Sequence, residues 1–389
     1  MTNKLSIQAV LILVCLLAVI LTACAGGGDS VDHESIENTL ADVTVEWPQS
    51  VRRFALGSCA KERLPQPIWS TIAAQNPELF LFIGDNQYAD KWSPDGGELR
   101  STPVTDPNRF YEAYETLASI PEFAAFRQTV PIMAVWDDHD YGANDQGKEY
   151  AFKQQSQKAF LDFFQFPLNS PIHQQAGIYH AKVFGKTGQR VQFIMLDTRY
   201  HRDPIDENPE GRPENKGPYI ATNDASRSML GEQQWHWLAA QLQQEADIRF
   251  IVSSVQVVAF EHSWETWGNM PHERDRLYNL IRDTQANGVI ILSGDRHLTE
   301  ISVDTGQLGA NPPYPIWDFT ASGMTDEKKD VNEDNSFRVG GVFRQSHFGG
   351  VEIEWGQANQ ATKVILTAID EQGMVLNQQT VDVSSLQVM

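Results

Sequence analysis

The stretch Ile132-Met-Ala-Val-Trp136-Asp-Asp-His-Asp140 joins a short apolar run to a dense group of carboxylate and imidazole side chains. A short apolar run with a β-branched residue predicts a strand buried on both faces, and the polar residues mark its carboxyl end. In open α/β sheets, binding sites form outside the carboxyl ends of the strands. This stretch therefore predicts the fold class, α/β, and also the sheet edge at which a functional site lies.

Similar apolar runs alternate along the chain with longer segments of helical character, a pattern typical of strand–helix units. The predicted strands are Arg53–Gly57, Leu79–Ile83, Ile132–Trp136, Val191–Leu196, Phe250–Ser254 and Val289–Leu292. The predicted helices are Pro67–Gln75, Asn108–Leu117, Lys148–Phe164, Glu232–Gln243 and Glu273–Thr284. The tail predicts a set of antiparallel strands, which are Val351–Trp355, Lys363–Asp370 and Val375–Val383. We expect one domain over residues 51–389, because no Pro- or Ser-rich linker divides it.

The composition excludes several classes of protein. The chain has 389 residues, and its 51 Asp and Glu against 30 Lys and Arg give a formal charge of −21. Nucleic-acid binding requires a basic surface, so we expect no nucleic-acid partner. The hydrophobic fraction of 41% excludes a disordered chain, and three cysteines are too few for a disulfide scaffold.

The N-terminus predicts targeting rather than fold. Ala9 to Leu21 is unbroken apolar sequence, which is short for a membrane span but suits a signal-peptide core. It runs into Leu21-Thr-Ala-Cys24, which resembles a bacterial lipobox. We therefore expect a signal peptide over residues 1–23, lipidation of Cys24 and a flexible tether over 24–50. An ordinary signal peptide is the alternative. The lipid anchor predicts a cell-envelope location, on the periplasmic side of the outer membrane if the source is Gram-negative.

The residues that directly follow the predicted strands are the candidates for a functional site. Five strand ends deliver Cys, Asp, Tyr, His, Asn and Arg side chains to one sheet edge. They are Ser58-Cys59, Gly84-Asp85-Asn86-Gln87-Tyr88, Asp137-Asp138-His139-Asp140 with Asn144, Asp197-Thr198-Arg199, and Gly294-Asp295-Arg296-His297. So many anionic groups would repel one another unless cations lay among them, so the pattern predicts a metal site.

In order, six segments resemble the alkaline phosphatase D (PhoD-like) family of calcineurin-type metallophosphatases. They are Phe54-Ala-Leu-Gly-Ser-Cys59, Gly84-Asp-Asn-Gln-Tyr-Ala-Asp90, Trp136-Asp-Asp-His-Asp-Tyr-Gly-Ala-Asn-Asp145, Leu196-Asp-Thr-Arg199, Gly231-Glu-Gln-Gln-Trp-His-Trp-Leu238 and Leu292-Ser-Gly-Asp-Arg-His297. The resemblance covers roughly residues 51–383. It implies a four-layer α-β-β-α sandwich with a metal cluster at one edge. We expect this chain to lack the extra N-terminal β-domain of the best-known members.

The resemblance also implies a ligand set for two or more metal ions. Cys59, Asp85, Tyr88 and His297 would hold the first ion, expected to be Fe(III). Asp85 would bridge to a second ion, expected to be Ca(II), completed by Asn144 and Asp295. Asp138 occupies a position at which many related enzymes have a ligand asparagine, so it competes with Asn144. Zinc and manganese remain alternatives for the metal identity.

The expected reaction is hydrolysis of a phosphate ester by a metal-activated hydroxide. His139 is the candidate that protonates the leaving group or contacts the phosphoryl oxygen, and Asp140 is the candidate that orients its imidazole. Arg199 is a candidate phosphate clamp, with an intra-fold ion pair as the alternative. Trp264 and Trp267 are candidates for the entrance of the site, and a packing role is the alternative for both.

Three functions remain open at this point. The first is a phosphomonoesterase or phosphodiesterase of the cell envelope. The second is a phospholipid or wall-polymer phosphodiesterase, which the lipid anchor would hold against its substrate. The third is a binding lipoprotein that keeps the fold without catalysis, against which the intact set of candidate ligands argues.

Overall fold

The computed structural model describes residues 45–91, 101–309, 311–325, 333–357 and 360–388. The predicted signal peptide over residues 1–23, the lipidation site Cys24 and residues 24–44 of the predicted tether lie outside the described residues. Trp47 stacks on Phe184 with ring centroids 6.2 Å apart, and Gly185 donates a backbone hydrogen bond to Gln49. In the parts described, no helix has the length and apolar character needed to cross a membrane.

Within the described residues, the first large sheet has six strands in the order β15-β14-β13-β1-β2-β3. Its strands are β1 (Arg53–Gly57), β2 (Phe80–Ile83), β3 (Ile132–Val135), β13 (His347–Glu354), β14 (Lys363–Asp370) and β15 (Val375–Asp382). β1, β2 and β3 run parallel, whereas β13 pairs antiparallel with β1 and with β14. β14 and β15 are also antiparallel, which confirms the predicted C-terminal strand set.

The second large sheet has seven strands in the described residues, in the order β12-β10-β11-β9-β8-β5-β4. Its strands are β4 (His180–Phe184), β5 (Val191–Met195), β8 (Ile248–Ser253), β9 (Val289–Ser293), β10 (Thr299–Asp304), β11 (Ile316–Ala321) and β12 (Arg338–Phe343). β5, β8, β9 and β11 are parallel neighbours. A separate two-stranded hairpin consists of β6 (Asp206–Glu207) and β7 (Tyr219–Ile220).

The two large sheets pack face to face, and aromatic side chains fill the space between them. Phe54 on β1 makes edge contacts with Phe193 on β5 and Phe250 on β8, at centroid distances of 5.0 and 4.8 Å. Such edge-to-face pairs stabilise a core beyond the apolar area they bury. All three rings are buried, so each sheet supplies an apolar inner face to a shared core.

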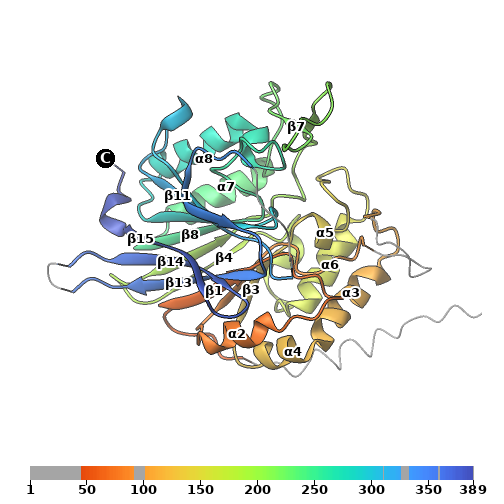
Figure 1. Cartoon of the computed structure of the whole chain (residues 1–389), viewed down its shortest axis with the longest axis horizontal. Coiled ribbons are helices and arrows are strands. Elements are labelled where there is room, and N and C mark those ends of the chain that lie inside the picture. The colour runs from red at the N-terminus through yellow and green to blue at the C-terminus, as the bar shows by residue number, and fades with distance from the viewer. Residues whose placement is uncertain (1–44, 92–100, 310, 326–332, 358–359, 389) are drawn as a thin grey trace, which may run out of the picture. The chain divides into compact units, whose positions relative to one another are not determined.

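Helices cover the outer faces of the two sheets (Figure 1). They are α2 (Ile68–Ala74), α3 (Asn108–Ser119), α4 (Pro121–Arg127), α5 (Asp138–Tyr141), α6 (Lys153–Phe163), α7 (Gly231–Leu242) and α8 (Pro271–Asp283). Short 3-10 turns occur at Pro171–Gln174, Trp267–Asn269, Gln307–Gly309 and Val383–Ser385. α2 and α4 lie by the first sheet, whereas α7 and α8 lie by the second. The predicted four-layer α/β arrangement is confirmed.

The sequence pattern located the central strands better than the peripheral ones. The six predicted strands before the tail each overlap a strand of the structure, with end differences of at most two residues. The pattern missed β4, β6, β7, β10, β11, β12, α4 and α5. β12, for example, alternates little between buried and exposed positions. The predicted helix at 148–164 begins only at Lys153, because residues 148–152 form turns.

Candidate metal centre

The predicted ligands follow directly after strands of both sheets. Cys59 comes after β1, Asp85 after β2, and both Asp295 and His297 after β9. The backbones of these four residues have φ between 50° and 67°, in the left-handed region that non-glycine residues rarely adopt. Such conformations cost about 1–3 kcal/mol each and cluster at functional sites. The chain therefore holds these side chains in place with a locally unfavourable backbone.

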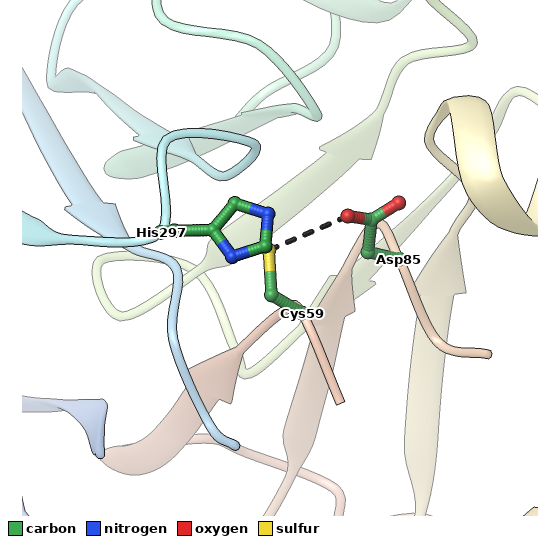
Figure 2. Close-up of side chains that lie close together, drawn as sticks. All are labelled: Cys59, Asp85 and His297. Carbon is green, nitrogen blue, oxygen red and sulfur yellow. Dashed lines mark hydrogen bonds between the residues drawn. The ribbon is translucent and has the colours of Figure 1, made fainter. Parts of the chain in front are cut away.

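Three of the predicted ligands converge on the carboxylate of a fourth, Asp85. The Cys59 thiol donates to Asp85 Oδ2 at 3.4 Å, and the Tyr88 hydroxyl donates to the same oxygen at 2.8 Å. Ligand atoms of Cys59, Asp85 and His297 all lie within 4.8 Å of one another. Figure 2 shows these three side chains pointing toward one another from separate segments. A cation would take the place of the two protons that now point at Asp85, so the donors present fit a metal ion.

Asp138 joins this group to a second cluster of acidic residues. Asp138 belongs to three groups of residues whose ligand atoms lie within 4.8 Å of one another. Its partners in these groups are Asp85 and His139, Asp137 and Asp295, and Asp145 and Glu265. Its Oδ2 accepts a hydrogen bond from the backbone of Asp145 at 2.8 Å. Asn144, the competing candidate, is exposed and lines the same cavity as Asp138 and Asp295. The structure therefore brings both candidates to the centre.

Burial is the main cause of the raised pKa values in this cluster. It raises the pKa of Asp85 to about 6 and that of Asp137 to about 8, and it raises the pKa of Asp295 well above the ordinary value. The pKa values of the Cys59 thiol and the Tyr88 phenol are also raised, again mainly by burial. Without a cation, burial therefore shifts these groups toward their protonated forms. A bound cation inverts that preference, because its charge stabilises the anionic forms.

His139 is fixed by Asp90, not by Asp140. Its Nδ1 lies 2.9 Å from both carboxylate oxygens of Asp90, whose side chain is fully buried. Asp140 instead caps the short helix α5: it accepts the backbone N–H of Asp137 at 2.6 Å and the Asn86 amide at 2.6 Å. The predicted orienting role of Asp140 is therefore wrong in this structure, because its oxygens are occupied by these donors.

The structure favours the ion-pair alternative for Arg199 over the phosphate clamp. The side chain has no exposed surface, and Nε donates to Asp137 Oδ1 at 2.7 Å. Nη1 and Nη2 donate to the two oxygens of Glu265 at 2.9 and 2.7 Å. With its donors turned to these carboxylates, Arg199 is not among the residues that line the cavity. It holds the acidic cluster together instead of reaching a substrate.

A cavity of about 400 Å³ opens onto the centre. Its lining residues are Lys91, Asp138, His139, Asn144, Asp145, Arg212, Asn215, Trp264, Asp295, Arg296, His297, Glu333 and Arg344. The predicted entrance role is supported for Trp264, which lines the cavity. Trp267 is fully buried and donates its indole N–H to Ser253, so the packing alternative describes it.

Sequence reasoning gave no role to several residues that belong to the centre. Asp90, Asp137, Asp145 and Glu265 lie in or against the acidic cluster. Asp90 ends the segment Gly84–Asp90, and Asp137 and Asp145 lie within Trp136–Asp145, so a local signal existed for these three. Glu265 lies far from them in sequence and comes after β8, in the segment around Trp264 and Trp267 that was considered only for the entrance of the site.

The structure is an α/β fold of two packed mixed sheets, with carboxylate, thiol and imidazole groups at their common edge. The fold is similar to that of a solved structure described as "Structure of PhoD", with a TM-score of 0.64, 17% identity, and coverage of 86% of this chain and 73% of that one. A purple acid phosphatase from yellow lupin (Lupinus luteus) seeds is similar at a TM-score of 0.52 and 13% identity, covering 86% of this chain and 55% of that one.

Sequence comparison gives the same family. Residues 54–377 match the PhoD-like phosphatase family, so the chain belongs to that family. Alkaline phosphatase D of Bacillus subtilis (strain 168) is 24% identical over 276 residues. That match spans 63% of this chain but 45% of the relative, so it covers under half of the relative's length. The resemblance noted in the sequence is confirmed.

Proposed function

We propose that the protein is a metal-dependent phosphoesterase that hydrolyses phosphate mono- or diesters. The convergence of Cys59, Tyr88 and His297 on Asp85 carries the proposal. Membership of the PhoD-like phosphatase family supports it. A cluster with only a structural role would not need four ligand-type residues at one sheet edge. Nor would it need three of them, Cys59, Asp85 and His297, to adopt the left-handed backbone conformation.

The donor set favours two different metal positions. A thiolate, a phenolate, a carboxylate and an imidazole suit Fe(III), so we assign Cys59, Tyr88, Asp85 and His297 to that ion. Oxygen donors suit Ca(II), which Asp85, Asp295 and either Asp138 or Asn144 would hold. Zinc or manganese would be alternative ions. Bound cations supply an activated water and neutralise charge on the phosphate.

His139 provides proton chemistry from the protein itself. In the metal-free protein, burial alone lowers the pKa of His139, but the charges of Asp138, Asp85 and Asp90 raise it to about 10. Asp90 engages Nδ1, so the Nε2 side of the ring remains for a substrate in the cavity that His139 lines. A protonated imidazole there donates to a phosphoryl oxygen or protonates the leaving alkoxide.

We place this activity at the bacterial cell envelope. The lipobox-like segment ending at Cys24 supports a lipid anchor on the membrane surface, on the periplasmic face of an outer membrane in a Gram-negative source. An anchored enzyme would meet soluble esters as well as phospholipids and wall polymers, which are the alternative diester substrates.

The test combines metal content with hydrolysis. Protein with its own metals is assayed with 4-nitrophenyl phosphate and bis(4-nitrophenyl) phosphate, and elemental analysis gives the metal stoichiometry. We expect turnover of at least one ester, and loss of one metal in Cys59→Ala and Asp85→Asn. Asp304→Asn is the matched control, because Asp304 is a buried acid that accepts a hydrogen bond from Tyr278 away from the site. Unchanged metal content in Cys59→Ala would remove Cys59 as a ligand, and no turnover by the metal-loaded protein would refute the proposed activity.

A further inference from the structure

Three arginines gather at the cavity beside the metal centre. Arg212 stacks on Trp264 with its guanidinium carbon 4.4 Å from the ring centroid, and Arg296 lies 5.0 Å from the same ring. Glu333 accepts hydrogen bonds from Arg296 at 2.8 Å and from Arg344 at 2.9 Å. Arg212, Arg296 and Arg344 thus form a continuous group around Trp264 and Glu333, which we call the arginine cluster. All five residues line the cavity.

The arginine cluster carries more positive charge than its neighbours neutralise. Glu333 is one carboxylate shared between two guanidinium groups. Asp295 lies 3.8 Å from Arg296, but our proposed function commits it to a cation. Arg212 forms no ion pair with any carboxylate in the described part of the chain. In a protein of formal charge −21, this local excess is unusual and favours binding of an anion.

Unused hydrogen-bond donors accompany this charge. The Nε atoms of Arg296 and Arg344 are buried and have no hydrogen-bond partner among the described residues. A buried donor without a partner costs free energy, and an anion that approached the guanidinium groups would supply acceptors. The Arg296 side chain is only 8% exposed. Its charge therefore lies in the packed wall of the cavity and not on a flexible side chain at the surface.

The β6–β7 hairpin holds Arg212 at this place. Figure 1 shows the hairpin reaching out beyond the second sheet near β7. Gly217 donates its N–H to His262 at 2.8 Å and Tyr219 to Ser263 at 3.0 Å, which ties the hairpin to the segment before Trp264. Tyr219 also donates its hydroxyl to Asp145 of the acidic cluster. The hairpin therefore links the metal centre to the arginine cluster.

We propose that the arginine cluster binds a second anionic group of the substrate, separate from the phosphate that is hydrolysed. The inference rests on the proposed function, because it places the scissile phosphate at the metal centre. A cavity of about 400 Å³ lies within the range that holds whole small molecules. The preferred substrates are therefore phosphate esters whose organic part carries a further phosphate or carboxylate.

The test measures binding without relying on catalysis. Benzylphosphonate, 4-carboxybenzylphosphonate and 1,4-bis(phosphonomethyl)benzene are titrated calorimetrically into the metal-containing protein. We expect the two probes with a second anion to bind about tenfold more tightly than benzylphosphonate, as charge-assisted hydrogen bonds would give. The two probes also separate a preference for carboxylate from one for phosphate.

Arg212→Ala is expected to reduce the preference for the two probes with a second anion over benzylphosphonate by at least about threefold. The double variant Arg212→Ala, Arg344→Ala is expected to abolish that preference. Arg282→Ala on α8 is the control for loss of a positive charge elsewhere, and it should keep the preference. Equal binding of all three probes to the wild type, or an unchanged preference in Arg212→Ala and in the double variant, would overturn the proposal. Hydrolysis of phenyl phosphate and methyl phenyl phosphate, measured in parallel, tests the proposed function separately.

Discussion

At the scale of single residues, the site depends on side chains whose roles come from their partners. Asp140 stands next to His139 in the sequence, yet the carboxylate that contacts the imidazole is Asp90, which is 49 positions away. The reason is the geometry of α5, in which Asp140 turns back to cap the helix. Sequence adjacency therefore assigned the wrong carboxylate to the histidine.

We predict that Asp90→Asn lowers kcat by about 10- to 100-fold with little change in KM, because the imidazole loses the partner that sets its orientation and charge. Steady-state kinetics with a chromogenic phosphate ester measures the effect. His139→Ala should cost about 10²–10⁴-fold if the ring acts as general acid. The double variant should be no slower than His139→Ala, since both changes act through one ring. A drop in KM and metal content without a kcat effect would contradict this role for Asp90.

At the scale of elements, the junctions between strands and loops position the metal ligands. Gly84 directly follows β2 with φ of 110°, and Asp85 comes next with φ of 50°. A Cβ at Gly84 would lie 2.7 Å from the Asp137 side chain, which is closer than atoms can pack. Glycine at this junction therefore lets β2 and the segment after β3 approach closely enough for Asp85 to meet Asp138.

We predict that Gly84→Ala lowers the free energy of unfolding by about 3 kcal/mol, from backbone strain together with overpacking. Chemical denaturation measures the change. Gly188→Ala is the matched control, because Gly188 also has positive φ, at 81°, but a Cβ there would meet no atom within 4 Å. It should cost only about 1 kcal/mol. Equal losses for the two variants would show that close packing at Gly84 is unimportant.

At the scale of the whole molecule, burial of acidic groups makes stability depend on pH and on metal. Burial is the main cause of the raised pKa values of Asp85, about 6, and of Asp137 and Asp145, about 8. A raised carboxylate pKa means that the folded state binds more protons than the unfolded state. The resulting stabilisation is complete below about pH 4 and is lost as the pH rises through the folded-state values.

Metal removal should therefore matter more at high pH. We predict that a chelator lowers Tm more at pH 8 than at pH 5, because cations bind the ionised carboxylates that otherwise destabilise the fold. Thermal melts at both pH values, with and without chelator, measure the difference. In Asp85→Asn the pH dependence of the chelator effect should shrink. A chelator effect independent of pH would argue against these carboxylates as ligands.

Much of the fold and of the candidate site could be predicted because it depends on local sequence patterns. Buried parallel strands appear in the sequence as short apolar runs. The residues that follow them lie at one sheet edge, independently of the conformation of the loops. The peripheral strands β10 to β12 could not be predicted in this way, since their burial depends on neighbours distant in sequence. The same holds for Glu265, which joins the centre through its ion pairs with Arg199 and Arg202.

The sequence by itself determined the α/β class, the strand ends that carry the candidate ligands and the family resemblance, because periodicity and strand-end chemistry are local properties. Only the tertiary structure decided which carboxylate meets His139, that Arg199 is locked in a buried ion-pair network, and that three distant arginines share one cavity. Those outcomes depend on which side chains from separate segments compete for the same buried donors and charges. Such competition is settled when the sheets pack together, not along the chain.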